Sequence, residues 1–256
     1  MCRSLLVGQI AAAMVLLVPR PGAGQGILVC ADAIQPQVAV DGTGKVYVAF
    51  LHRGNICVSR SDDKGKTFGG PMIAIDAKGT ARGGRQRGPR IGVDGLGNVV
   101  VTAFVSFDRA ELAKRYPAFD LFMARSEDLG ATWSRPTQLN SKTGMAPEGL
   151  HALVVTDSGK AYAAWLDIRG RTQPGQNIHY SAIVAGHAVF DTKVAEGVCE
   201  CCAPGMALTS AGLPVLAYRE GGERESRELF FQRHSKGSTG FEAKGRINVR
   251  DSMEFG

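Results

Sequence analysis

Charged residues recur four times directly after short apolar segments that are typical of β-strands. The four occurrences are His52-Arg53, Asp108-Arg109, Asp167-Ile168-Arg169 and Arg219-Glu220. One further arginine, Arg90, comes directly before such a segment. Because guanidinium groups form paired hydrogen bonds with carboxylates, arginines that lie close together at the ends of neighbouring strands would suit an acidic ligand. The predicted ligand-binding residues are therefore His52, Arg90, Arg109, Arg169 and Arg219.

Three carboxylates in the same loops, those of Asp108, Asp167 and Glu148, are candidate catalytic groups. Carboxyl groups near one another can serve as general acid and general base, and a tyrosine can serve as a nucleophile. Tyr162 and Tyr218 lie inside apolar segments, so we expect them in the core. A second interpretation stays open, in which the Asp–Arg neighbours are ion pairs between loops. The protein would then bind carbohydrate or another protein without catalysis.

Cysteines form the most unusual local cluster, the segment Cys199-Glu200-Cys201-Cys202. Three thiolates can bind a soft metal ion. Disulfides are the other interpretation, and free thiols remain a third. Adjacent Cys201 and Cys202 do not pair easily with each other, so Cys30 and Cys57 are the available partners. Apart from this alternative metal site, we expect no cofactor.

Composition and charge favour an ordinary folded domain that does not bind nucleic acid. The chain has 256 residues, 44% of them hydrophobic and 21% charged, which is ordinary for a folded domain. The formal net charge of +6 comes from scattered basic residues. The one local run, Arg82 to Arg90, is typical of a solvated loop. Without a nucleic-acid-binding motif, we predict no nucleic-acid partner. We expect a monomer that binds a small acidic ligand.

The N-terminal segment has the pattern of a secretory signal. Arg3 precedes an apolar stretch from Leu5 to Val18, and small residues follow up to Gly26. This stretch is too short for a membrane-spanning helix, and no later segment is apolar enough. We therefore predict a signal peptide over 1–26, a secreted or periplasmic protein, and no membrane span.

The rest of the chain repeats one unit. Each copy has an apolar strand, a glycine-containing turn and a second apolar strand, and it begins near Pro36, Pro89, Pro147 or Pro204. These prolines are 53, 58 and 57 residues apart. Two more strands follow in each copy, and four strands per unit of this length are typical of a propeller blade. The sequence predicts an all-β propeller of four-stranded antiparallel blades, about four in number, at 35–80, 88–140, 147–196 and 201–250.

Two octapeptides stand at equivalent places in the first two units. Ser61 to Phe68 and Ser126 to Trp133 both fit the pattern S-x-D-x-G-x-T-[FW]. The aspartate accepts hydrogen bonds from backbone N–H groups of the turn, and the glycine adopts a conformation that other residues resist. These segments resemble the Asp-box (BNR) repeats of the sialidase superfamily. The third and fourth units lack the aspartate.

This resemblance carries expectations for fold and activity. It implies a six-bladed ring, of which 27–256 would be a C-terminally incomplete part. It implies an exo-α-sialidase-type glycoside hydrolase, acting on sialic acid or another acidic glycan. The family's Arg-Ile-Pro motif is absent, since Pro89-Arg90-Ile91 has another order. The resemblance also places the ligand on the face opposite the Asp-boxes, where the charged loops lie.

Overall fold

The computed structural model describes residues 26–108, 110, 114, 117–221, 228–238 and 240–247. The predicted signal segment, except Gly26, and Arg109 lie outside these residues. Within the described ranges the chain forms strands, turns and loops, with no helix at all. None of this part could therefore cross a membrane as a long apolar helix.

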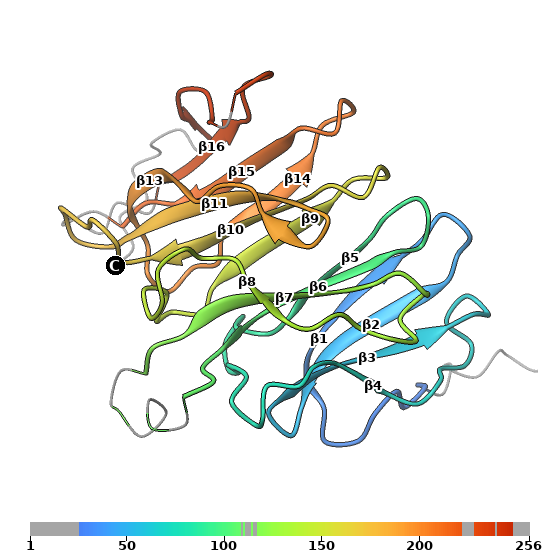
Figure 1. The fold of residues 1–256 in the computed structure, drawn as a ribbon. Coiled ribbons are helices and arrows are strands. Elements are labelled where there is room, and N and C mark those ends of the chain that lie inside the picture. Colours follow the sequence, from blue (N-terminus) through green and yellow to red (C-terminus); the bar gives the residue numbers. More distant parts are fainter. Residues whose placement is uncertain are drawn as a thin grey trace, which may run out of the picture.

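The strands form four antiparallel sheets that follow one another along the chain (Figure 1). The first sheet contains β1 (Ile34–Val40), β2 (Val46–His52), β3 (Asn55–Ser61) and β4 (Met72–Ile75). The second contains β5 (Arg90–Val93), β6 (Val99–Val105), β7 (Asp120–Ser126) and β8 (Thr137–Gln138). The third contains β9 (His151–Val155), β10 (Ala161–Asp167), β11 (Gln176–Val184), β12 (His187–Ala188) and β13 (Thr192–Val198). The fourth contains β14 (Gly205–Leu208), β15 (Pro214–Arg219), β16 (Leu229–Arg233) and β17 (Gly245–Arg246).

The third sheet differs from the prediction of four strands because its outer strand is divided in two. The long strand β11 pairs with β12 near Ile183 and with β13 from Gln176 to Tyr180. Between β12 and β13 the chain leaves the sheet and places Asp191 beside the neighbouring sheet. This break therefore creates a contact between sheets that an unbroken strand would not make.

The sheets are arranged like the blades of a propeller, which confirms the predicted fold class. The first strands of successive sheets contact one another in order, β1 with β5, β5 with β9, and β9 with β14. Separate apolar cores fill the spaces between consecutive sheets. Tyr218 lies in the third of these cores and Tyr162 in a further apolar cluster with Tyr180, at 4% and 3% exposure, so both are buried as predicted.

The turn between β3 and β4 has the hydrogen bonds that its sequence predicts. The Asp63 carboxylate accepts from the backbone N–H groups of Lys66 and Thr67, at 3.0 and 2.8 Å, and from the Thr67 hydroxyl at 2.6 Å. Gly65 has a φ of 82°, which is costly for other residues. Asp128 makes the equivalent bonds to Thr132, and the following Trp133 packs against the core between the first two sheets.

Strand direction separates these turns from the charged loops. Because neighbouring strands are antiparallel, the loops that follow β2, β6, β10 and β15 lie at the opposite end of the sheets from the turns that follow β3 and β7. The inner strands β1, β5, β9 and β14 begin at the same end as those charged loops. We call this end of the molecule the axial face.

Candidate functional site

A polar cavity opens on the axial face where β1 and β5 begin. Its volume is about 300 Å³, and its lining residues are Gln35, Gln37, Gln86, Gly88 and Arg90. We call it the axial cavity. Of the residues predicted to bind ligand, Arg90 is the one found in it. Two larger cavities, of about 420 and 390 Å³, lie beside the turns of the opposite face.

The loop that carries Arg90 also holds its side chain in place. One terminal nitrogen, Nη1, donates to the carbonyl oxygens of Gly88 and Pro89 at 3.2 and 3.0 Å. The other, Nη2, donates to the carbonyl oxygen of Gln86 at 3.0 Å. Burial lowers the pKa of this guanidinium from 12.5, but the group remains charged at neutral pH. The cavity therefore contains a positive charge in a fixed position.

Backbone strain surrounds the same cavity. Gln35, Arg85 and Gln86 all have positive φ values, 56°, 31° and 60°, a region that residues other than glycine seldom adopt. A Cβ atom at Gly88 would come within 2.6 Å of the Cβ atom of Gln35, so only glycine fits there without displacement. Such strain concentrates at binding and catalytic sites, where the surrounding structure maintains it.

Histidine and glutamate side chains lie next to this loop. His151 is fully buried, with Nε2 3.0 Å from the Thr102 hydroxyl and Nδ1 without a hydrogen-bond partner. Burial, and secondarily the charge of Arg90, hold the pKa of His151 well below 6.5. The imidazole is therefore neutral at neutral pH. Glu148, a predicted catalytic residue, forms an ion pair with Arg87 at 2.8 Å and is partly exposed.

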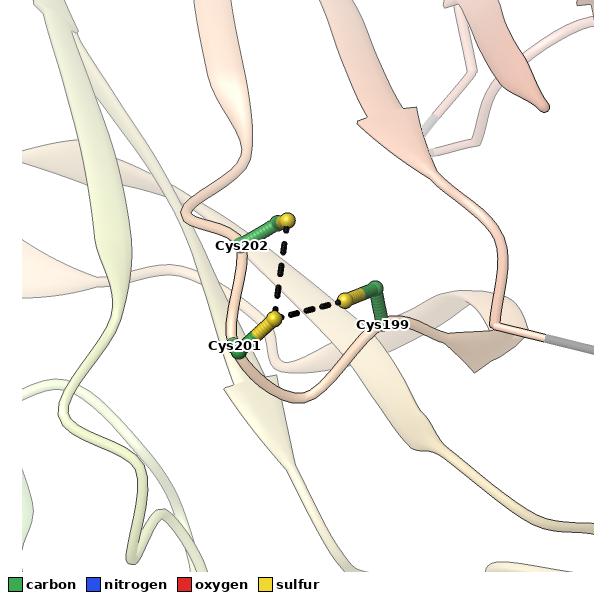
Figure 2. A group of neighbouring side chains, drawn as sticks. All are labelled: Cys199, Cys201 and Cys202. Carbon is green, nitrogen blue, oxygen red and sulfur yellow. Dashed lines mark hydrogen bonds between the residues drawn. The ribbon is translucent and has the colours of Figure 1, made fainter. Parts of the chain in front are cut away.

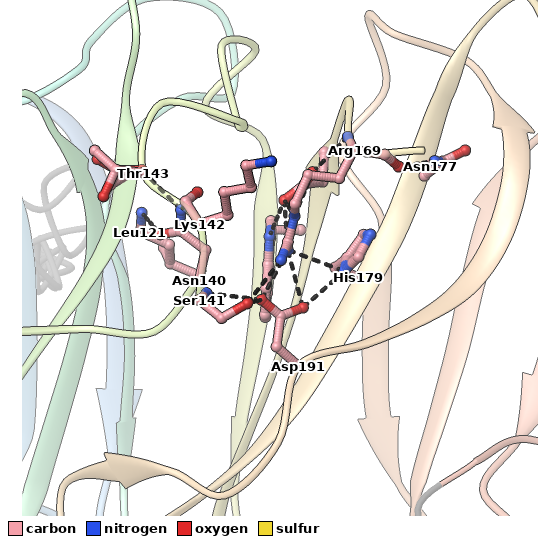
Figure 3. Close-up of polar contacts among 12 residues, drawn as sticks. Leu121, Asn140, Ser141, Lys142, Thr143, Arg169, Asn177, His179 and Asp191 are labelled. Carbon is pink, nitrogen blue, oxygen red and sulfur yellow. Dashed lines mark hydrogen bonds and ion pairs between the residues drawn. The ribbon is translucent and has the colours of Figure 1, made fainter. Parts of the chain in front are cut away.

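Arg169 belongs to a different group of contacts, between the second and third sheets (Figure 3), and Asp167 is part of the same group. Nε of Arg169 donates to both carboxylate oxygens of Asp167, at 2.9 and 3.0 Å. Nη1 donates to the Ser141 hydroxyl at 2.8 Å, and Nη2 lies 2.7 Å from an Asp191 oxygen. His179 completes the group, with Nδ1 2.7 Å from Asp191. We call these five residues the Arg169 cluster.

The Arg169 cluster has the geometry of a link between blades. The Asp167 side chain is 0% exposed and the Arg169 side chain 15% exposed, so little of either is open to a ligand. Asp167 also accepts a hydrogen bond from the Trp165 indole at 3.1 Å. Asp167 and Arg169 lie in one loop, and the contact of Arg169 with Ser141 joins this loop to the second sheet.

The other predicted site residues lie apart from Arg90. His52 ends β2, opposite Asn55 across the turn. The exposed Asp108 accepts a hydrogen bond from the N–H of Ala110 at 2.9 Å. Arg219 ends β15, next to the cysteine cluster. Within the described part of the chain, Arg90, Arg169 and Arg219 therefore have separate surroundings instead of a shared one.

The cysteines form two separate groups. The sulfur atoms of Cys199, Cys201 and Cys202 lie within 4.8 Å of one another. Cys57 lies in β3 of the first sheet, where burial and the nearby Cys30 raise the pKa of its thiol. All five described cysteines are free thiols in this structure. Cys30 and Cys57 are thus neighbours of each other, and neither forms a disulfide with the Cys199 group in this structure.

The glutamines of the axial cavity were missing from the sequence prediction. Gln35, Gln37 and Gln86 carry no charge and follow no motif, so their types and spacing gave no signal. The repeat register still places Gln35 and Gln86 before first strands, on the axial face. A search of those loops for amide as well as charged side chains would have included them.

Acid is expected to weaken the Arg169 cluster. Burial opposes ionisation of Asp191, but hydrogen bonds from His179, Ser141 and Arg169 outweigh it and lower the pKa to about 2, from 3.8. A carboxyl whose pKa is lower in the folded state stabilises the fold above its unfolded pKa, and this contribution is lost as the pH falls through the folded pKa. Stability should therefore fall by roughly 2 kcal/mol between about pH 5 and pH 2 through this group alone.

Urea unfolding of the wild type and of Asp191→Asn at several pH values measures this effect. The variant should be less stable at neutral pH and lose less stability in acid. Asp157→Asn, which changes an exposed carboxyl, is the matched control and should follow the wild type. Parallel pH profiles for wild type and Asp191→Asn would contradict the prediction.

Comparison with known proteins identifies the fold. No protein-family model matches the sequence, and no curated protein matches it. A Hadza microbial sialidase has a TM-score of 0.52 and 18% identity over 78% of this chain and 43% of its own. A Dyadobacter fermentans protein of unknown function has a TM-score of 0.57 and 15% identity over 85% of this chain and 70% of its own. Penicillium chrysogenum α-L-arabinanase complexed with arabinobiose has a TM-score of 0.56 and 15% identity over 85% of this chain and 67% of its own.

These likenesses bear on the fold alone, because all the identities are low. The chain spans less than half of the length of the sialidase that it resembles. Together with the four successive antiparallel sheets, they show that this chain has the β-propeller fold that occurs in glycosidases.

Proposed function

We propose that this protein is a carbohydrate-active propeller that binds an acidic glycan in the axial cavity. The main support for this proposal is the position of Arg90, whose half-buried guanidinium is held in place beside the glutamine side chains of the cavity. Guanidinium groups bind carboxylates, and amides exchange hydrogen bonds with sugar hydroxyls. Likeness to a sialidase and to an arabinanase complexed with arabinobiose supports the choice of a sugar ligand.

Sialidase-type hydrolysis is the finer candidate function. Glu148 favours it, because this carboxyl is partly exposed on the same face and forms an ion pair with Arg87, in the loop that also carries Arg90. The resemblance of the octapeptide turns to Asp-boxes points to the same superfamily. Asp167 is a poorer candidate acid, since its carboxylate is buried and bound to Arg169. Binding without hydrolysis remains the alternative, supported by the separate surroundings of the three arginines.

The proposed site of action is outside the cytoplasm, as the N-terminal segment indicates. Expression of the full chain and of a chain lacking residues 1–26, followed by cell fractionation, tests this. Export of the full chain alone is expected, and equal retention of both chains in the cytoplasm would contradict it.

Replacing Arg90 with alanine is expected to weaken glycan binding at least about 10-fold, since a hydrogen-bonded charge contributes about 1.5–3 kcal/mol. Calorimetry with sialic acid and uronic-acid oligosaccharides measures the affinity, and a fluorogenic sialoside measures hydrolysis. Arg90→Lys should retain part of the affinity, because it keeps the charge but loses the planar fork.

The matched control is Arg135→Ala, which removes an equal charge from an exposed position near the opposite face. This control should bind as the wild type does. Thermal unfolding of each variant separates loss of binding from loss of fold. Absence of binding and turnover with every acidic glycan, by the folded wild type, would overturn the proposed function.

A further inference from the structure

Three cysteine side chains point toward one another in the turn between the third and fourth sheets (Figure 2). Sγ of Cys201 lies 3.2 Å from Sγ of Cys199 and 3.9 Å from Sγ of Cys202. The turn is closed by a hydrogen bond from the N–H of Cys202 to the carbonyl oxygen of Cys199. We call Cys199, Cys201 and Cys202 the cysteine turn.

The spacing of the sulfur atoms suits a single metal ion. With metal–sulfur bonds of about 2.3 Å, the sulfur atoms lie about 3.8 Å apart in a tetrahedral site and about 4.0 Å apart in a trigonal one. The separations of 3.2 and 3.9 Å, with every pair within 4.8 Å, require only small movements to reach these values. No large backbone change is needed.

Disulfide formation cannot use all three thiols within the turn. A bond between any two of them leaves the third cysteine unpaired. The remaining described cysteines do not offer a partner, because Cys57 lies inside β3 of the first sheet and Cys30 is near it. A metal ion, in contrast, engages the three sulfur atoms together.

The surroundings hold the turn in position and offset its charge. The N–H of Cys199 donates to the carbonyl oxygen of Arg219 at 2.9 Å, which fixes the turn to the end of β15. Nε of Arg219 is buried and has no hydrogen-bond partner, and its charge acts on Cys199 and Cys202. Three thiolates around a monovalent or divalent ion leave net negative charge. The Arg219 guanidinium offsets this charge in full for a divalent ion and in part for a monovalent one.

The cysteine turn is closed on one side and open on the other. Cys199 is 5% exposed. Gly221 lies so close to it that a Cβ atom on Gly221 would be 3.2 Å from the Cα atom of Cys199. Cys201 is exposed, so an ion can enter from solvent. In the described residues no other His, Cys, Asp or Glu joins the group. Three protein ligands with one open position is the arrangement of a metal site that can take an external ligand.

We propose that Cys199, Cys201 and Cys202 bind one closed-shell thiophilic ion, Cu(I) or Zn(II), as three thiolates. Three thiolates complete a trigonal site for Cu(I), whereas a tetrahedral Zn(II) ion keeps one coordination position open. Binding releases the thiol protons to solvent, so affinity rises with pH. The site is distinct from the axial cavity but adjoins it, since the N–H of Ala203 lies 3.4 Å from Oε1 of Gln86. Its chemistry does not depend on glycan binding.

Titration of the reduced full chain tests this site. Cu(I) is added without oxygen against a chromogenic copper chelator, and Zn(II) is added in air-free buffer against a chromogenic zinc chelator. One ion per chain is expected, with protection of three thiols from alkylation. Co(II) substitution should give the visible and near-ultraviolet bands of thiolate coordination. Binding of one of the two ions alone supports the proposal and identifies the ion.

Serine variants identify the ligands. Cys199→Ser, Cys201→Ser and Cys202→Ser should each lose stoichiometric binding, whereas Cys30→Ser, the matched control outside the turn, should keep it. Circular dichroism checks each fold, and the Co(II) spectrum of the wild type gives a readout independent of any variant. The proposal is overturned if the fully reduced wild type binds neither ion, or if Cys30→Ser alone abolishes binding.

Discussion

Arg169→Leu is expected to destabilise the chain by about 3–5 kcal/mol, because it leaves buried carboxylates without their partner. The side chains of Asp167 and Asp191 are 0% and 6% exposed, and both bind this guanidinium. Leucine has no donor to replace these hydrogen bonds. The contact with Ser141, which links the second sheet to the third, is lost as well. Urea unfolding at neutral pH measures the effect.

Arg171→Leu is the matched control for this variant. Arg171 lies two residues along the same loop, is exposed, and donates one long hydrogen bond of 3.3 Å to the Gly175 carbonyl oxygen. Its replacement should change stability by less than about 0.5 kcal/mol. Adding Asp191→Asn to Arg169→Leu should recover part of the loss, since it removes one unpaired charge. Equal stabilities of the two leucine variants would contradict a structural role for the cluster.

Gly54→Ala is expected to cost at least about 2 kcal/mol, from backbone strain and from a steric clash. Gly54 has a φ of 70°, and a Cβ atom there would lie 2.5 Å from the carbonyl oxygen of Gly79. The neighbouring backbone must move, because no flexible side chain is available to yield. The Gly54 carbonyl oxygen also accepts a hydrogen bond from Ala81, at the start of the segment that leads to Arg90. Glycan affinity should therefore fall together with stability.

Gly42→Ala provides the comparison within the same sheet. Gly42 has no positive φ, and a Cβ atom there would meet nothing within 4 Å. Its replacement should leave both melting temperature and glycan binding unchanged. If Gly54→Ala behaved in the same way, the close packing of the β2–β3 loop against Gly79 would not be required for the fold.

The predictable part of the fold depends on short-range chemistry. In the turn after β3, the Asp63 side chain reaches backbone groups only three and four residues ahead, so the pattern of eight residues contains the whole motif. The same holds for the repeating strands and turns, which gave the all-β fold class and its four sheets. The break in the outer strand near Asp191 was not predicted, because it is stabilised by Ser141, 50 residues away.

The candidate site was predictable only as a face of the molecule. Antiparallel strand order determines that Arg90, Asp167 and the cysteine turn share one end of the sheets, and this follows from the sequence alone. Tertiary structure decided which residues meet there. The i,i+2 spacing of Asp167 and Arg169 is compatible with a ligand site or an ion pair. In the structure the two side chains pair, and Arg169 also contacts Ser141 of the second sheet and Asp191 of its own sheet. Gln86 meets Ala203, 117 residues away, for the same reason: blade packing sets such distances, whereas sequence spacing sets only the local ones.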